Sequence, residues 1–431
     1  MAREKLILVP SKRMDRNGSS SRGENNLVRM SQAAREYMGY EKTVEVYPET
    51  EDTNTRLSRN MLLNVFRAYT DDLRELKRQG FSKEELKRVG FVTSEVFNKV
   101  TGGDSDEPCS NIWITDSVDH TIIGADPEFL MFDSGGNIVD VSNYLPYNGP
   151  LGYDHVGAVA EIRPAPAIKP EELVANIKSI LADTNISGKE LREYDWKAGC
   201  YHAGEHRAYC LGGHIHIGNP AKVACMGREA RTMFFRVFNK ILDELVALPL
   251  IKIDGKMYGS QRRRRYGHFG GFRMYEADGR MEYRTLSGMW LMHPTLTEAT
   301  FGVAKAVIDE VYRYVSDSGF DMKYISGNTT SGVDVFHYNF KSWESIPLVS
   351  DMRCTRPSKE MIKLLSESDD SLVDDKYLKS WYKSMKSLSS YERYGKYVDN
   401  LYEILKNDRD ALDNFDKELK RNWLTDVKFL E

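Results

Sequence analysis

The chain has 431 residues, of which 41% are hydrophobic and 11% are aromatic. This length and composition fit a globular protein of two or three domains and exclude a largely disordered chain. The formal net charge of -4 gives no support for a general binder of nucleic acid, which would need a local basic patch. We therefore expect neither nucleic acid nor a membrane as a partner.

The five cysteines are odd in number, widely spaced and free of any C-x-x-C pair. Such a set favours reduced thiols over a disulfide framework or a zinc site. No apolar run reaches membrane-spanning length, and the first ten residues lack the hydrophobic stretch of a signal peptide. These features together predict a cytoplasmic protein.

Residues 1–115 are expected to form an appended N-terminal α/β domain. Leu6–Val9 and Thr43–Tyr47 have the composition of short strands, and Asn60–Arg78 has that of a helix. Gly102–Pro108 is rich in glycine and acidic residues, which predicts a linker. The following region would then fold separately.

Residues 116–346 contain four short stretches in which two ionisable residues stand at positions i and i+2. The first is Asp126-Pro-Glu128, and the second is Glu161-Ile-Arg163 at the end of an apolar run. Residues at i and i+2 of a strand project from one face, so each stretch predicts a strand with one polar face. A turn at Asp133–Asn137 predicts a hairpin after the first stretch, and Pro170 predicts the start of a helix after the second.

The third stretch is Gly212–Gly218, in which His214 and His216 alternate with isoleucines. The histidines would share one face and the isoleucines the other, while the glycines leave room for a ligand or a second backbone. Paired histidines can also be ordinary solvated residues. The fourth stretch is Glu282-Tyr-Arg284.

Long helices are expected around these strands. Ala221–Leu248 has an amphipathic pattern, and a similar helix follows His293-Pro294. Residues 347–431 are expected to form a helical C-terminal region. The catalytic domain is then expected to lie between the two flanking regions, at 116–346. Strands interleaved with long helices predict an α+β fold, in which an antiparallel sheet is backed by helices on one face.

If the four strands are adjacent, their polar faces form one surface of carboxylates, imidazoles and guanidiniums. Such a surface is costly unless its charges are paired with each other, with metal or with ligand. Carboxylates with a histidine suit Mg2+ or Mn2+, whereas the sequence contains neither H-E-x-x-H nor a cysteine cluster for zinc. Divalent ions beside arginines indicate a phosphate ligand.

The segment Arg262–Arg273, rich in arginine and glycine, fits a phosphate-binding role because glycines would let the backbone follow a triphosphate. The chain lacks both the P-loop motif and the G-x-G-x-x-G motif. We therefore expect neither a P-loop NTPase nor a Rossmann protein.

Four motifs follow one another in the order D-P-E-F, D-x6-E-x-R-P, G-G-H-x-H-x-G and F-R-x8-E-Y-R. This order, over roughly residues 118–300, resembles the glutamine synthetase-like carboxylate-amine ligases (amidoligases), and most closely the phage phiEco32-like COOH-NH2 ligases. The resemblance implies a curved antiparallel sheet that holds ATP and Mg2+ (or Mn2+). It further implies that the γ-phosphate passes to a carboxylate, and that an amine then attacks the acyl phosphate to form an amide.

The resemblance also implies roles for single residues. Arg273 and Arg284 are expected to stabilise charge on the transferring phosphoryl group, and Arg163 to bind the carboxylate substrate. The expected metal ligands are Asp126, Glu128, Asp154, Glu161, His214 and Glu282. The expected nucleotide contacts are Gly213, His216, Arg262, Arg264 and Arg265. The partners would be a small-molecule or peptide carboxylate and amine, in the host cytoplasm if the chain is phage-encoded.

Two alternatives share the fold or the nucleotide site. A guanidino-kinase-like phosphotransferase would also use an arginine-lined nucleotide site, but it would leave a stable phosphorylated product. A catalytically inactive phage structural or scaffold protein would keep the fold without the reaction, although each expected ligand position holds a competent residue. A nucleic-acid binder resting on Arg262–Arg265 is disfavoured by the acidic charge balance.

Overall fold

The structure is a computed structural model of the chain that describes residues 7–11, 26–30, 113–115, 117–154, 157–204, 207–224, 228–275, 279–318, 346–368, 370–407 and 409–430. The chain divides into two compact units. One comprises residues 1–114 and 221–231, and the other comprises residues 115–220 and 232–431. The domain boundaries expected at residues 115 and 346 stay predictions.

The first unit contains an antiparallel strand pair near the start of the chain. β1 (Ile7–Ser11) pairs with β2 (Asn26–Met30), so the strand expected at Leu6–Val9 is present and extends slightly further. The same unit contains the short helix α7 (Ala221–Ala224). The strand expected at 43–47, the helix at 60–78 and the linker at 102–108 lie outside the described residues.

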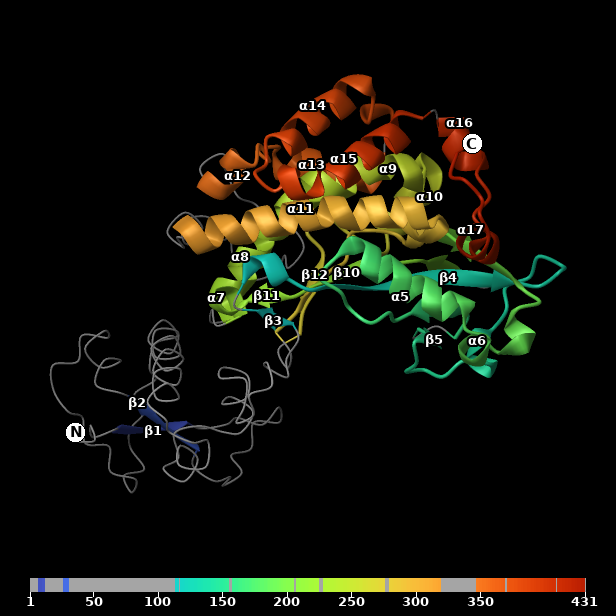
Figure 1. Cartoon of the computed structure of the whole chain (residues 1–431), viewed down its shortest axis with the longest axis horizontal. Coiled ribbons are helices and arrows are strands. Elements are labelled where there is room, and N and C mark those ends of the chain that lie inside the picture. Colours follow the sequence, from blue (N-terminus) through green and yellow to red (C-terminus); the bar gives the residue numbers. More distant parts are fainter. Residues whose placement is uncertain are drawn as a thin grey trace. The chain divides into compact units, whose positions relative to one another are not determined.

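An antiparallel sheet forms the centre of the second unit (Figure 1). Within the described residues its seven strands run in the order β12-β13-β10-β4-β6-β5, and β7 also pairs with β4. This arrangement confirms the α+β class, while the glutamine synthetase-like assignment stays a prediction. The strands are β4 (Ile123–Phe132), β5 (Leu151–Tyr153), β6 (Val159–Ile162), β7 (Asp195–Ala198), β10 (Gly213–Ile217), β12 (Phe272–Met274) and β13 (Met281–Tyr283).

The four strands expected to carry polar faces are neighbours in this sheet. They stand side by side in the order β13, β10, β4 and β6. The adjacency that the shared polar surface requires is therefore present. Strand β10 is central in this set, and its alternation of histidine and isoleucine separates the polar face from the core.

The other face of the sheet is apolar and packs against helices. Ile215 and Ile217 of β10 are buried there. The long helix α11 (Pro294–Ser318) packs against α5 (Pro170–Ala182) and α15 (Tyr391–Lys406) and lies above the strands in Figure 1. Phe234 and Phe238 of α8 (Arg228–Leu242) pack against Tyr312 of α11. The helices expected at Pro170 and after His293-Pro294 are thus confirmed.

The single helix expected at Ala221–Leu248 is wrong in its extent. After α7 and α8 the chain forms a wider π-helical turn at Asp243–Ala247, then α9 (Leu248–Asp254) and α10 (Lys256–Arg263). The wider turn contains Asp243, whose carboxylate accepts hydrogen bonds from the Tyr283 hydroxyl, at 2.6 Å, and from the Gly270 amide. These two bonds connect the helix to β13 and to the segment before β12.

The turn expected at Asp133–Asn137 is confirmed. Asp133 Oδ1 accepts from the amides of Gly135 at 2.9 Å and Asn137 at 2.8 Å. The second arm of the expected hairpin pairs only through the bridge between Phe132 and Ile138, and a short 3-10 turn follows. The hairpin is therefore shorter than its composition predicts.

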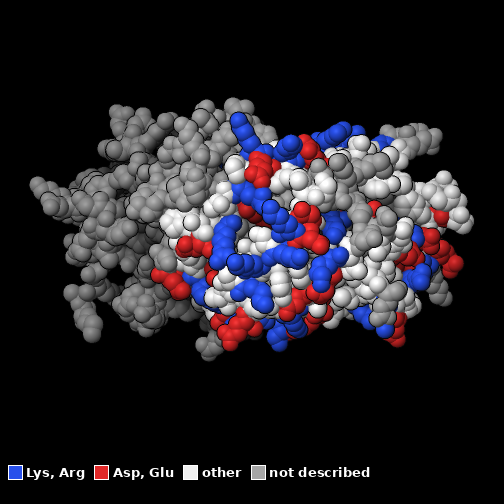
Figure 2. All heavy atoms as spheres, turned by 90° about the horizontal axis from the view of Figure 1, so that it is seen from above, with Lys and Arg blue, Asp and Glu red and all other residues white. Residues whose placement is uncertain are grey.

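The C-terminal region is helical, as expected, and packs within the unit that contains the sheet. Trp381 Nε1 donates to the Leu245 carbonyl and Trp423 Nε1 to the Leu291 carbonyl, both at 2.8 Å. On the helical side of the molecule, basic and acidic side chains are interspersed (Figure 2). The helices of this region besides α15 are α12 (Pro347–Asp351), α13 (Ser358–Glu367), α14 (Asp375–Lys386), α16 (Arg409–Asn414) and α17 (Leu419–Leu424).

The described residues also form a short ribbon and several minor elements. In the ribbon, β8 (Tyr201–Ala203) pairs with β9 (Ala208–Cys210). The minor elements include β3 (Ile114–Thr115), α6 (Thr184–Leu191), β11 (Asn219–Pro220) and the 3-10 helix Gly288–Met292. Among the helices that the structure describes, none has both the length and the apolar character needed to cross a membrane.

Candidate active site

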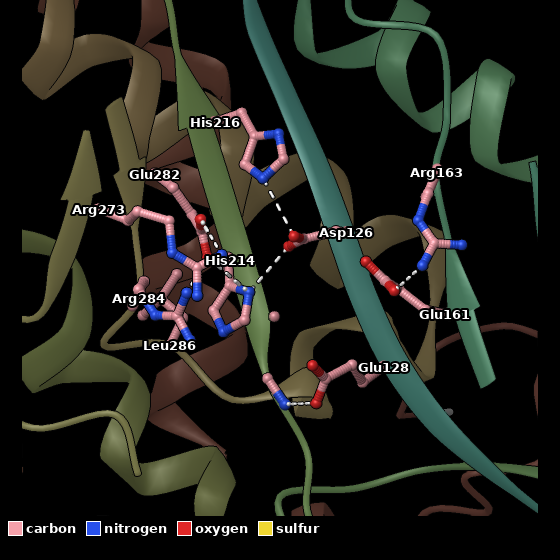
Figure 3. Close-up of polar contacts among 12 residues, drawn as sticks. Asp126, Glu128, Glu161, Arg163, His214, His216, Arg273, Glu282, Arg284 and Leu286 are labelled. Atoms are coloured by element: carbon pink, nitrogen blue, oxygen red, sulfur yellow. Dashed lines mark hydrogen bonds and ion pairs between the residues drawn. The ribbon is translucent and has the colours of Figure 1, made fainter. Parts of the chain in front are cut away.

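The register of the sheet brings the polar residues of neighbouring strands face to face. His214 lies opposite Asp126, and His216 lies opposite Glu282. Arg273 of β12 lies opposite Glu282 on its other side. Figure 3 shows these side chains turned toward one another over the strands. Because the i and i+2 residues of each strand share a face, the register gathers them into one cluster.

Asp126 contacts both imidazoles. Its Oδ1 lies 2.9 Å from His214 Nδ1, and its Oδ2 lies 3.1 Å from His216 Nε2. His214 Nδ1 also lies 3.3 Å from Glu282 Oε1. Yet Asp126 Oδ1 and His214 Nδ1 are buried atoms, and neither forms a hydrogen bond of acceptable geometry with any described residue. A close, buried and poorly aligned pair of this kind suits a site completed by a cation.

Asp126, His216 and Glu282 form a candidate metal-binding group. One ligand atom from each lies within 4.8 Å of the others. Two carboxylates and one imidazole suit Mg2+ or Mn2+. The sequence prediction placed His214 with the metal and His216 near the nucleotide, whereas the geometry groups His216 with the two acids.

The two imidazoles balance the charge of this group. Burial alone would raise the pKa of Asp126, but His214 and His216 hold it well below its usual range. Burial alone would lower the pKa of His214, but the carboxylates of Asp126, Glu128 and Glu282 raise it. Asp126 therefore remains ionised beside the two imidazoles.

Glu128 and Glu161 form a second acidic group on the same face. They lie directly opposite each other in β4 and β6, and both are buried. Burial raises the pKa of Glu128 to about 7 and that of Glu161 to about 9, and the charges of Asp126 and Asp154 act in the same direction. Two carboxylates so placed repel each other unless they share a proton or a cation.

Each acid of this pair has one further partner. Glu128 Oε2 accepts a hydrogen bond from the Gly212 amide at 2.5 Å, and Glu161 is paired with Arg163. Asp154 follows β5 and raises the pKa of both acids, so it belongs to the same acidic neighbourhood. The register thus brings the other five expected metal ligands, Asp126, Glu128, Glu161, His214 and Glu282, to one face of the sheet.

Arg273 and Arg284 both reach Glu282. Arg284 Nη1 lies 2.7 Å from Oε1, and Arg273 Nη1 lies 3.3 Å from Oε2. The side chain of Arg273 is 53% exposed and that of Arg284 is 18% exposed. Arg163, which is 31% exposed, stands beside Glu161. Arginines therefore flank the row of acids that runs from Glu282 to Glu161, with Arg273 and Arg284 at one end and Arg163 at the other. Their partly exposed guanidiniums are accessible to an anionic ligand.

Arg262 and Gly213, two of the expected nucleotide contacts, are both involved in packing and hydrogen bonding inside the protein. Arg262 is 0% exposed, and its guanidinium donates to three backbone carbonyls. A Cβ at Gly213 would fall 2.2 Å from the Ser287 carbonyl oxygen and 2.3 Å from Trp290 Nε1, so this glycine allows close backbone packing. The expectation that Arg262 contacts the nucleotide is corrected, because its side chain is enclosed by the protein. Nucleotide contact by Gly213 stays a prediction.

Arg264 and Arg265 follow helix α10 and are exposed. The Arg265 guanidinium lies 5.9 Å from the centre of the Tyr201 ring on β8. The four consecutive arginines thus divide into an inward pair and an outward pair. Nucleotide contact by Arg264 and Arg265 stays a prediction.

Sequence reasoning missed two tyrosines of the cluster. The Tyr266 hydroxyl lies 2.9 Å from His214 Nε2 and also contacts Arg284. The Tyr275 hydroxyl donates to Glu282 Oε2 at 2.8 Å. Tyr275 stands two residues after Arg273, so the same alternation could have identified it. Tyr266 follows a helix end and has no comparable signal.

Comparisons with known proteins address the identity of this fold and site. Residues 123–326 match a family model described as "Phage phiEco32-like COOH.NH2 ligase-type 2". A search of curated proteins found no match to the chain. A crystal structure of a bifunctional glutathione synthetase from Pasteurella multocida is similar at 11% sequence identity and a TM-score of 0.31, over 69% of this chain and 55% of that chain. The chain thus spans about half the length of that enzyme.

The family match covers all four polar strands, β12 and helix α11. It confirms the resemblance inferred from the order of the motifs, which come from the same strands. Over residues 123–326 the chain is therefore similar to the phage phiEco32-like carboxylate-amine ligases.

Proposed function

We propose that the protein is an ATP- and Mg2+-dependent carboxylate-amine ligase that forms an amide through an acyl phosphate. The observation that carries this proposal is the register of β13, β10, β4 and β6, which places two acidic groups and their bordering arginines on one face. The family match supports the class of product. We also assign the antiparallel sheet to the glutamine synthetase-like type, which its single polar face supports.

Two cation positions fit the side chains of this face. Asp126, His216 and Glu282 would hold one ion, and Glu128 and Glu161 would hold a second with Asp154 nearby. The misaligned buried pair Asp126–His214 and the raised pKa values of the opposed acids both fit a cation in place of protons. Mg2+ or Mn2+ bound there would neutralise phosphate oxygens and draw charge from the γ-phosphoryl group.

The arginines would orient the two reactants at the ends of the acidic row. Arg273 and Arg284 would bind phosphate oxygens through their guanidiniums, and Arg163 would bind the carboxylate. A carboxylate oxygen would attack the γ-phosphorus, the bond to ADP would break, and an acyl phosphate would form. The amine nitrogen would then attack the acyl carbon, release phosphate and lose its proton.

A guanidino-kinase-like phosphotransferase is the second candidate, because the arginines around Glu282 would serve either reaction. Product analysis separates the two. A ligase converts ATP, an acid and an amine into an amide, ADP and phosphate, whereas a kinase leaves a stable phosphorylated product. A structural protein of the same fold would form neither.

The test is a screen of acid and amine pairs in which ADP, phosphate and amide are measured together. We expect one pair to yield all three in equal amounts, and Glu128→Gln to abolish them. The control is Glu392→Gln, which alters an exposed acid of α15. Full ligase activity in the Glu128 variant would contradict the assignment of the site.

A further inference from the structure

The pairing of β10 with β13 contains one extra residue beside the acidic groups. The regular pairing ends with Ile215 opposite Tyr283, and the next bridge joins Gly212 to Ser287. Between these two pairs lie two residues on one strand, 213 and 214, and three on the other, 284–286. An extra residue on one strand is a β-bulge, which re-aims side chains and disrupts the ladder locally. His214 and Arg284 both lie in this bulge.

Arg262 supplies hydrogen bonds to the carbonyl groups of the bulge. Its Nη1 donates to the Thr285 carbonyl at 2.9 Å, and its Nη2 donates to the Leu286 carbonyl at 2.6 Å. Its Nε donates to the Leu211 carbonyl at 2.8 Å, directly before β10. One planar guanidinium therefore joins the backbones of both strands. A lysine could not reproduce this geometry, because its three N–H donors radiate from one nitrogen and do not form a planar fork.

The charge of Arg262 has no carboxylate within ion-pairing distance among the described residues. Burial lowers its pKa, and the carbonyl dipoles are its direct hydrogen-bond partners. The ring of Tyr266, centred 5.4 Å from Cζ, adds a cation-π contact. Burying a cation that is held mainly by carbonyl groups costs free energy, so it contributes little to the stability of a fold. The planar guanidinium of Arg262 is, however, well suited to hold two backbone segments at a fixed distance from each other.

The backbone held by Arg262 is continuous with the site. The Gly212 amide, next to Leu211, donates to Glu128 Oε2 at 2.5 Å. The Gly213 amide donates to the same Leu286 carbonyl at 3.1 Å. A Cβ at Gly267, where φ is +67°, would fall 2.0 Å from Arg262 Nη1, so the loop leaves space for the guanidinium. Loss of the guanidinium would therefore release the backbone that holds Glu128 and His214.

We propose that Arg262 is a positioning residue that fixes the bulge between β10 and β13 and thereby places Glu128, His214 and Arg284. It acts through the backbone and touches neither nucleotide nor metal. Its effect on ligand binding rests on the proposed function, whereas its contacts with the bulge do not.

The first test compares Mn2+ binding by the full-length wild type and by Arg262→Lys, measured by calorimetry. The variant keeps the charge but loses the planar fork that spans the three carbonyls, so we expect affinity to fall by about 10- to 100-fold, as for other residues that orient metal ligands. The control is Leu401→Ala, which removes packing from the buried face of α15. It is expected to lower stability while leaving Mn2+ affinity unchanged. An Arg262→Lys protein that is folded and binds Mn2+ as tightly as the wild type would overturn the proposal.

The second test observes the guanidinium N–H groups of wild-type Arg262 by nitrogen-15 NMR, and needs no variant to fold. Three fixed carbonyl partners predict separate Nη signals that exchange slowly with water. Gly267→Ala, which crowds Nη1, should shift and broaden these signals and weaken Mn2+ binding as well. Averaged, rapidly exchanging signals in the wild type would overturn the proposal. If the wild type binds no Mn2+, the ligase proposal fails, and the NMR result alone decides the role of Arg262.

Discussion

The two acidic groups of the polar face differ in how their charge is balanced. Asp126 and Glu282 lie among two imidazoles and two guanidiniums, and the imidazoles hold the pKa of Asp126 well below its usual range. Glu128 and Glu161 face each other, and burial raises both pKa values. A cation at the first group must compete with the arginines that contact Glu282, whereas a cation at the second group must displace protons. The two groups should therefore respond differently to substitution and to pH.

The largest effect is expected at Asp126, because it contacts both histidines and its charge raises the pKa of Glu161. Asp126→Ala should reduce Mn2+ affinity by more than about 100-fold, since it removes a metal ligand that also orients two imidazoles. Manganese binding can be followed by electron paramagnetic resonance. Asp119→Ala, which removes an exposed partner of Arg393, is the matched control and should bind Mn2+ normally. Equal affinity in both variants would contradict the assignment of Asp126.

Cation binding at the second group should strengthen as pH rises. At neutral pH Glu161, with a pKa of about 9, holds a proton that a cation must displace, and Glu128, with a pKa of about 7, holds one part of the time. Affinity should rise by about tenfold per pH unit for each proton displaced. Calorimetry in buffers of different ionisation enthalpy counts these protons. Glu161→Gln should remove the part of the dependence that extends to pH 9, and an unchanged profile would disprove this account.

The same raised pKa values should destabilise the metal-free protein at high pH. Both values lie above the ordinary 4.5, so the folded state holds protons that the unfolded state has released. The free energy of unfolding should therefore fall between pH 4.5 and 9, by up to about 1.4 kcal/mol per pH unit for each group. Urea unfolding of the wild type and of Glu128→Gln/Glu161→Gln measures this, because glutamine does not titrate. A wild-type curve that falls no more steeply than that of the double variant would contradict it.

A smaller effect is expected at Tyr275, whose hydroxyl donates to Glu282 at 2.8 Å. Tyr275→Phe removes one hydrogen bond to a carboxylate that also has two arginine partners. Nucleotide affinity should fall by roughly two- to tenfold, the value of one net hydrogen bond. Tyr258→Phe, at an exposed position on α10, is the control for loss of a hydroxyl. A loss of more than two orders of magnitude would instead indicate that Tyr275 contacts the reacting groups.

The sequence was sufficient to predict the polar faces because strand alternation is a local property. It placed Asp126 with Glu128 and His214 with His216, and the order of the motifs indicated that their strands belong together. The relative roles of the two histidines could not be predicted, since they depend on which strand lies on each side. His216 is opposite Glu282, whereas His214 is opposite Asp126.

The four consecutive arginines show a second limit of sequence reasoning. Their composition indicated phosphate, but helix α10 ends at Arg263, and only Arg264 and Arg265 are exposed. The carbonyls that Arg262 satisfies come from a bulge more than twenty residues away along the chain. The hydrogen-bonding role of Arg262 depends on carbonyl groups that are distant in the sequence, so no local pattern around Arg262 could predict it.

The most direct test of the central claim is calorimetric binding of a non-hydrolysable ATP analogue to the full chain, with and without Mg2+. It requires no knowledge of the acid or the amine. The account predicts Mg2+-dependent binding by the wild type and by Glu392→Ala, and its loss in Glu282→Ala. A folded wild type that binds no nucleotide with Mg2+ present, or a Glu282→Ala protein that binds as the wild type does, would contradict it.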